Sequence, residues 1–184
     1  MRAFVALEVD NPTVLDALVG AQMKLSSTGA DLKLVERENL HFTLKFLGEV
    51  PDSLAEEAAS RLKGLSSRGG KVSVEGVGAF PNPGRPRVLW AGVSPSDEGT
   101  VISIAGEVLS RLKGVGEDDQ RGFKAHLTLA RVRSDRGAQR LAAAIGELSS
   151  TKFGETNLAS VKLKSSQLTS SGPVYRDVGV FPLA

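Results

Sequence analysis

The sequence predicts an α+β fold made of two similar lobes of antiparallel sheet and helices, related by a pseudo-twofold axis around a cleft. Strand-like and helix-like segments are mixed along the chain with short connections, which favours antiparallel sheets over a doubly wound parallel one. One four-residue pattern occurs twice, about half the chain apart. The strongest break, the Pro-rich stretch 81–86, lies near the midpoint. We therefore expect residues 1–184 to form one domain of two lobes connected near 81–86.

The first half of the chain contains clear strand and helix signals. Residues 2–9 are rich in apolar and β-branched side chains and predict a strand. Asn11 followed by Pro12 is a helix-start signal, with Asn as the cap and Pro in the first turn. A second helix should begin at Asp52 or Ser53, where a cap residue precedes an apolar helical face. The expected strands are 2–9, 31–36, 40–47 and 71–80, and the expected helices are 12–26 and 52–65.

The second half continues this mixed pattern. A polar loop is expected at 114–122, and Ser170-Ser171-Gly172-Pro173 predicts a turn between two closing strands. The expected strands are 87–93, 123–132, 158–168 and 174–181, and the expected helices are 96–113 and 135–148. The whole chain should therefore contain eight strands and four helices.

Composition limits the classes of function. With 23 Lys and Arg against 21 Asp and Glu, the formal net charge is +2, which permits an anionic partner but argues against coating of nucleic acid over the whole surface. The absence of cysteine excludes disulfides, thiolate nucleophiles and Cys-containing metal sites. No segment reads as a signal peptide or approaches the length of about 18 apolar residues that a membrane span needs. We expect a cytoplasmic protein that does not bind membranes.

The repeated pattern contains the only two histidines of the chain. It reads His41-Phe42-Thr43-Leu44 in the first copy and His126-Leu127-Thr128-Leu129 in the second. Only eight residues are threonine, so Thr two positions after both histidines is unexpected by chance. In a strand the side chains alternate, so each copy places one imidazole and one hydroxyl on the same face. A single strand histidine is usually structural, whereas two matched His-Thr pairs point to a shared site.

Each of the residues that flank the motifs has two possible roles. Lys45 is in phase with His41 and Thr43, which would let it contact phosphate, although a strand-edge lysine is also a common protective device. Arg131 points away from His126 on strict alternation, unless the strand ends or bulges before it. Arg85 and Arg87 lie in the Pro-rich stretch and would contact an RNA backbone or be solvated charges of a turn.

Two imidazoles and two hydroxyls are suited to displacement at phosphorus. One histidine can act as the base and the other as the acid, because imidazole titrates near neutrality. The hydroxyls of Thr43 and Thr128 can donate to the non-bridging phosphoryl oxygens. The sequence has no Gly-x-Ser-x-Gly nucleophile motif, no phosphate-binding P-loop and no His spacing typical of zinc. We expect no metal and no other cofactor.

Several strings of the sequence, taken together with the paired motif, resemble the two-histidine phosphoesterase superfamily. The resemblance is to its RNA 2′,3′-cyclic phosphodiesterases, also described as 2′-5′ RNA ligases, and it extends over nearly the whole chain. The matching strings are Arg2-Ala3-Phe4-Val5-Ala6, Glu38 to Gly48, Arg87-Val88-Leu89-Trp90, Phe123 to Arg131, Ser166-Gln167-Leu168 and Gly172-Pro173-Val174-Tyr175. Ala125 stands where relatives often have Pro, a difference that affects no catalytic position.

The resemblance implies a specific reaction and site. It implies that a ribose 2′,3′-cyclic phosphate is opened to a 2′-phosphate without a metal, with His41 as proton donor and His126 as proton acceptor. It also implies that Arg131 contacts the substrate. The expected partner is RNA with 2′,3′-cyclic phosphate ends, such as tRNA fragments or short oligonucleotides, acted on by a monomer.

Two alternatives remain open. One is ligation of cyclic phosphate ends to 5′-hydroxyl ends in the same site. The other is a non-catalytic RNA-binding module, which the small number of aromatic residues makes less favoured.

Overall fold

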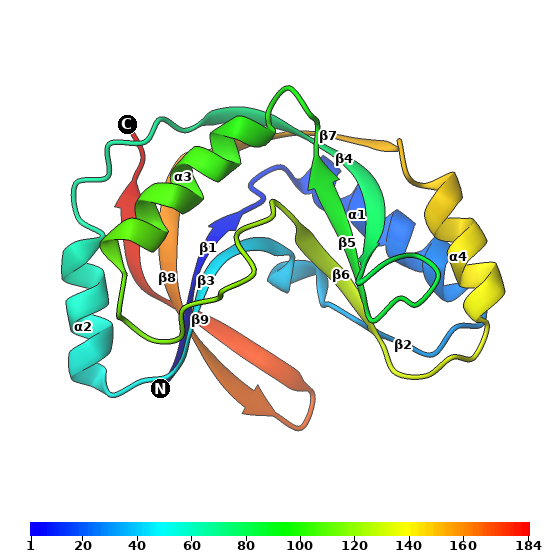
Figure 1. The fold of residues 1–184 in the computed structure, drawn as a ribbon, viewed down its shortest axis with the longest axis horizontal. Helices are drawn as coiled ribbons and strands as arrows, with labels where there is room; N and C mark the ends of the chain where they lie inside the picture. Colours follow the sequence, from blue (N-terminus) through cyan, green and yellow to red (C-terminus); the bar gives the residue numbers. More distant parts are fainter.

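The computed structural model describes residues Met1–Ala184 and has an α+β fold, as the sequence predicts. All nine strands belong to one curved sheet, and every pairing in it is antiparallel (Figure 1). The strands are β1 (Arg2–Glu8), β2 (Leu32–Leu34), β3 (His41–Glu49), β4 (Gly70–Phe80), β5 (Val88–Val93), β6 (Leu127–Val132), β7 (Lys152–Leu158), β8 (Ser160–Thr169) and β9 (Gly172–Pro182). The α-helices are α1 (Pro12–Ser26), α2 (Asp52–Arg61), α3 (Glu98–Arg111) and α4 (Ala138–Glu147).

The sheet divides into two lobes of similar strand order. The first lobe has the order β3-β1-β8-β9 and the second has the order β6-β5-β4-β7, with the short β2 paired to β6. The two lobes meet at β3 and β6 through the single residue pair Phe42 and Leu127. Helix α3 packs against β3, while α1 and α4 cover the second lobe. One continuous cluster of buried apolar side chains includes residues of both lobes.

The lobes are interleaved along the chain, so the stretch 81–86 does not separate them. The first lobe takes β1 and β3 from the N-terminal part of the chain, and β8 and β9 from its C-terminal end. Residues 81–86 join β4 to β5, which are neighbours in the second lobe with Phe80 opposite Val88. Pro and Gly favour tight turns of every kind, so a hairpin loop gave the same signal as a boundary between lobes.

Strand β7 was not predicted from the sequence, because its apolar pattern is interrupted. Its buried residues are Phe153, Thr156 and Leu158, which do not keep a period of two. A register shift against β4 explains this spacing, since Val74 pairs with Gly154 while the next residue of β4 pairs with Lys152. Phe153 is therefore an extra residue, which reverses the alternation.

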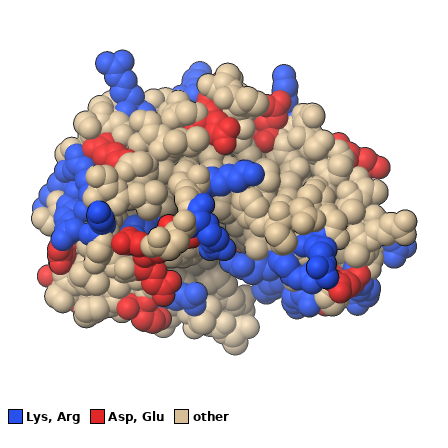
Figure 2. Space-filling model, viewed as in Figure 1, with Lys and Arg blue, Asp and Glu red and all other residues tan.

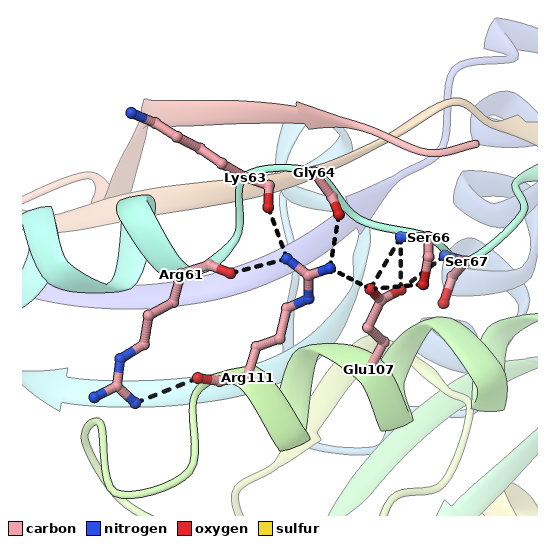
Figure 3. Close-up of polar contacts among 7 residues, drawn as sticks. All are labelled: Arg61, Lys63, Gly64, Ser66, Ser67, Glu107 and Arg111. Atoms are coloured by element: carbon pink, nitrogen blue, oxygen red, sulfur yellow. Dashed lines mark hydrogen bonds and ion pairs between the residues drawn. The ribbon is translucent and has the colours of Figure 1, made fainter.

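Polar contacts fix the ends of α2 and α3 to each other (Figure 3). The guanidinium of Arg111 donates to three carbonyls that follow or end α2, those of Arg61, Lys63 and Gly64. Arg61 in turn donates to the carbonyls of Arg111 and Lys113. These bonds satisfy carbonyls that have no partner within their own helix. Burial alone raises the pKa of Glu107, but hydrogen bonds from Ser67 and Ser66 outweigh it and lower the pKa to about 2.

None of the helices is both long enough and apolar enough to cross a lipid bilayer.

Candidate active site

Both motif strands contain a β-bulge directly after the motif threonine. In β3, Thr43 pairs with Ala6 and Lys45 pairs with Val5, so Leu44 is the extra residue. In β6, Thr128 pairs with Trp90 and Ala130 pairs with Leu89, so Leu129 is the extra residue. The repeated sequence thus has a repeated backbone irregularity, and each bulge moves the following side chains to the opposite face.

The bulge changes the expected position of Lys45. Its side chain is only 2% exposed and lies on the side of the sheet away from His41, where it forms an ion pair of 2.5 Å with Asp118 and donates to the Glu117 carbonyl. Lys45 is therefore not placed to contact a phosphate beside His41. Strict alternation from His41 would put Phe46 on the buried face with Phe42, but Phe46 is 58% exposed and on the His41 face.

The bulge in β6 has the converse effect on Arg131. The sequence left open whether strict alternation continues to Arg131 or whether the strand ends or bulges before it. The structure shows a bulge before Arg131. Arg131 is exposed and lies on the same face as Thr128. It occupies the position in the second motif that Phe46 occupies in the first.

A cavity of about 590 Å³ brings four of the predicted residues together; we call it the main cavity. These four residues are His41, Thr43, Thr128 and Arg131. Its other cationic wall residues are Arg2 and Lys33, and its acidic wall residues are Glu36 and Glu117. Three cations against two carboxylates give the main cavity a net positive lining, which suits an anionic ligand. Lys and Arg also gather at the lower right of the surface in Figure 2, over the region of β2 and the β4–β5 loop.

His41 is held in one orientation by its neighbours. Its Nδ1 lies 2.6 Å from the carbonyl oxygen of Asn39, which can only accept, so Nδ1 carries a proton and Nε2 is the nitrogen available for chemistry. Nε2 lies 3.0 Å from the hydroxyl of Thr43. The ring stacks on Phe4 at 5.0 Å and meets the ring of Tyr175 edge-on at 5.6 Å. Burial lowers the pKa of His41 to about 4.

His126 has the same backbone contact but different surroundings. Its Nδ1 lies 2.8 Å from the carbonyl oxygen of Lys124, which again leaves Nε2 free. The ring is edge-on to Phe80 at 4.9 Å, and burial lowers its pKa below the usual value. His126 does not line the main cavity.

Backbone pairing nevertheless places the two motifs next to each other. Phe42 and Leu127 are paired and both fully buried, so their neighbours in each chain segment point to the opposite face. Extending this antiparallel register by one residue places His41 beside Thr128 and His126 beside Thr43. The geometry can therefore present two imidazoles and two hydroxyls to one group.

Sequence comparison assigns the family. Residues 9–90 match the family described as LigT like Phosphoesterase. A relative from Archaeoglobus fulgidus named RNA 2′,3′-cyclic phosphodiesterase is 42% identical over 98% of this chain and 99% of its own length. A relative of the same name from Methanothermobacter thermautotrophicus is 36% identical over 100% of this chain and 99% of its own length. The chain belongs to the LigT-like phosphoesterases. It is therefore an enzyme of phosphoester chemistry.

Solved structures of this family share the fold. The TT0787 protein of Thermus thermophilus superposes with a TM-score of 0.76 at 29% identity, covering 99% of this chain and 97% of that chain. E. coli LigT complexed with 3′-AMP gives a TM-score of 0.78 at 20% identity, covering 100% of this chain and 98% of that chain, which supports the fold alone. The curved antiparallel sheet and four helices are thus the architecture of LigT-like phosphoesterases.

Sequence reasoning about individual positions did not identify the residues that surround His41. Glu8 is the cross-strand partner of His41, and it belongs to a cluster of four charged residues on neighbouring strands. The members of this charged cluster are Glu8, Lys162, Lys164 and Asp177, joined by four ion pairs. Lys162 and Lys164 occupy alternate positions of β8, a spacing that the sequence shows, but the pairing of distant strands is what brings them to His41.

Proposed function

We propose that this LigT-like phosphoesterase hydrolyses RNA 2′,3′-cyclic phosphate ends to 2′-phosphomonoesters, with His41 as proton donor and His126 as proton acceptor. The observation that carries the proposal is the pairing of Phe42 with Leu127, which brings the two motif strands together next to a cationic cavity lined by His41, Thr43 and Thr128. The names of the relatives from Archaeoglobus and Methanothermobacter support the substrate.

The proposed reaction needs one proton removed and one supplied. Nε2 of His126 takes a proton from water as the water oxygen bonds to phosphorus. The bond between phosphorus and the 3′ oxygen breaks, and Nε2 of His41 gives that oxygen a proton. In this proposal Thr43, Thr128 and Arg131 donate hydrogen bonds to the non-bridging oxygens, where negative charge accumulates.

The acid role of His41 depends on the substrate. With a pKa of about 4, its imidazole is neutral at pH 7 in the empty cavity. The phosphodiester anion favours the charged imidazolium when it binds close by, so substrate binding itself recruits the proton. His126, also neutral, is ready to act as a base.

The proposal has further features. No three His, Asp or Glu side chains form a group suited to hold a metal ion, so we propose catalysis without a metal or other cofactor. We propose tRNA fragments or short oligonucleotides as substrates, a cytoplasmic location and a monomeric state.

One assay tests this function directly. Purified protein is incubated with excess chelator and a nucleoside 2′,3′-cyclic phosphate, and the 2′- and 3′-monophosphates are separated. We expect the 2′-monophosphate alone. The 3′ isomer as product would contradict the assignment of the leaving oxygen, and activity restored only by a divalent ion would contradict the metal-free mechanism.

Ligation is a second candidate function for the same site. In ligation a 5′-hydroxyl takes the place of water beside His126. A groove next to His126 favours this candidate.

A further inference from the structure

A second groove of about 440 Å³ begins at the residues that precede His126. Lys124 and Ala125 line it, as does Trp90, which is the cross-strand partner of Thr128. The second groove and the main cavity have no wall residue in common. It therefore lies on the His126 side of the site, where the proposed mechanism places the attacking oxygen.

Trp90 is the one aromatic residue that lines the second groove. The Trp90 ring lies across Gly78 and Gly92, and a Cβ atom at Gly78 would stand 2.3 Å from this ring. The Phe80 ring packs against two rings: its centroid is 5.3 Å from that of Trp90 and 4.9 Å from that of His126. The indole N–H of Trp90 is buried and has no hydrogen-bond partner. A nucleobase offers both a stacking face and acceptor atoms, and base–aromatic stacking contributes about 1–3 kcal/mol.

Lys124 adds an exposed cation above the Trp90 ring. Its ammonium stands 5.3 Å from the Trp90 ring centroid and 5.4 Å from that of Phe80. The side chain is exposed and forms no ion pair, so it can lie over a base that stacks on Trp90.

The charges that line the main cavity and the second groove indicate different ligands. The main cavity has three cations and two carboxylates in its lining, whereas the second groove has only Lys124 against Glu75 and Glu98. A phosphate is favoured in the main cavity and disfavoured in the second groove. The second groove is therefore suited to the uncharged end of a nucleic acid strand, a nucleoside with a free 5′-hydroxyl.

We propose that the second groove binds the 5′-terminal nucleoside of an acceptor RNA strand and presents its 5′-hydroxyl to His126. This inference rests on the proposed function. In the step, the 5′ oxygen bonds to phosphorus as Nε2 of His126 takes its proton. The bond from phosphorus to the 3′ oxygen breaks, and His41 supplies the proton to that oxygen. The product is a 2′–5′ phosphodiester with a free 3′-hydroxyl.

Binding is testable without any chemistry, because Trp90 is the only tryptophan in the chain. Its fluorescence, excited so that Tyr175 does not contribute, is followed while adenosine is added to the wild-type protein. We expect a saturable change that ribose alone does not produce, and weaker binding of 5′-AMP. Glu98→Gln should reduce this preference for adenosine over 5′-AMP. No change with adenosine would overturn the proposal.

Competition between water and adenosine tests the orientation. A nucleoside 2′,3′-cyclic phosphate is incubated with adenosine, and the ratio of 2′–5′ dinucleoside product to 2′-monophosphate is measured. Both products come from the same bound cyclic phosphate, so defects in the main cavity cancel in this ratio. We expect Trp90→Leu to lower the ratio about tenfold, the lower part of the stacking range. We expect Lys124→Gln to lower it about threefold, the range of a cation–π contact at an exposed site. The exposed Lys24→Gln serves as the matched control.

The outcomes separate this inference from the proposed function. An unchanged ratio in both variants would reject the second groove as the acceptor site, even if adenosine binds. If the wild-type protein consumes no cyclic phosphate at all, the proposed function fails, and the fluorescence titration alone decides whether the second groove binds a nucleoside. Circular dichroism of Trp90→Leu shows whether that variant is folded, and Lys124→Gln tests the proposal through an exposed side chain if it is not.

Discussion

The two motif strands have the same backbone design but opposite surroundings. Each has an imidazole whose Nδ1 contacts the carbonyl two residues earlier, a threonine, and a bulge at the next leucine. Yet His41 packs against Phe4 and Tyr175, which also contact each other, and lies near the charged cluster, whereas His126 faces Phe80 next to Trp90. The repeated backbone positions both imidazoles, while the neighbouring strands determine what each imidazole meets.

Equivalent positions in the two lobes show how the difference arises. Ala6 pairs with Thr43 as Trp90 pairs with Thr128, so these two residues are equivalent. The next strand has Lys162 opposite Ala6, and Gly78 opposite Trp90. The small Ala6 thus has an ion-paired lysine as its neighbour, and the large Trp90 has a glycine under its ring. One lobe has a charged surface beside its histidine and the other has an aromatic one.

The largest effect should come from removing either histidine. We expect His41→Ala and His126→Ala each to lower turnover by about 100-fold or more, the usual range for a positioned acid or base. A cyclic phosphate with a better 3′ leaving group should rescue His41→Ala far more than His126→Ala, because only the former lacks its proton donor. Equal rescue of both variants, measured by initial rates, would reject the separate roles but leave the two-histidine site standing.

Arg131 occupies the position after its bulge that Phe46 occupies in the other motif, so substituting Arg131 sharpens the comparison. We expect Arg131→Ala to lower kcat/KM about tenfold or more, because a charge-assisted hydrogen bond to phosphate contributes about 1.5–3 kcal/mol. Arg133→Ala is the matched control, since Arg133 is exposed and paired with Asp31. A loss of similar size in both variants would show a general effect of surface charge.

The sequence predicted the fold class and most elements because apolar periodicity and cap residues are local signals. It also predicted the repeated His-Thr pairs and their common direction, since alternation over three residues needs no other strand. Alternation failed at Lys45 and Phe46 because a bulge depends on the partner strand, which the sequence does not show. The charged cluster and the surroundings of Trp90 likewise depend on which distant strands are paired.

Lys45 should affect stability rather than substrate binding. We expect Lys45→Ala to lower the free energy of unfolding by about 2 kcal/mol, because it removes a buried hydrogen-bonded charge that holds the segment leading to His126. Denaturant titration measures this loss, with the exposed Lys71→Ala expected to change stability by less than about 0.5 kcal/mol. A large rise in KM for a cyclic mononucleotide, at unchanged stability, would return Lys45 to a role in phosphate binding.

The different burial of the two histidines should appear in the pH dependence of stability. In the folded protein His41 has a pKa of about 4, below the usual histidine value of 6.5, so the unfolded chain binds a proton first as pH falls. The free energy of unfolding should therefore decrease as pH falls from about 6.5 towards 4. His41→Gln should remove most of this decrease. If His126→Gln instead removed the larger part of the decrease, burial would affect His126 more than His41.

The smallest effect should come from the charged cluster. Among its members, Lys164 lowers the pKa of His41 and Glu8 raises it, although burial has the larger influence. Glu8→Gln removes the carboxylate and leaves Lys164 with one fewer partner, and both changes disfavour the imidazolium. We therefore expect the pKa of His41 to fall further, by less than about one unit. NMR titration of the two histidine rings measures this, with His126→Gln giving the assignment.

The pKa of His126 should not change, because the charged cluster belongs to the other lobe. An equal shift of both histidine pKa values would mean that the surroundings of the two histidines are electrostatically coupled.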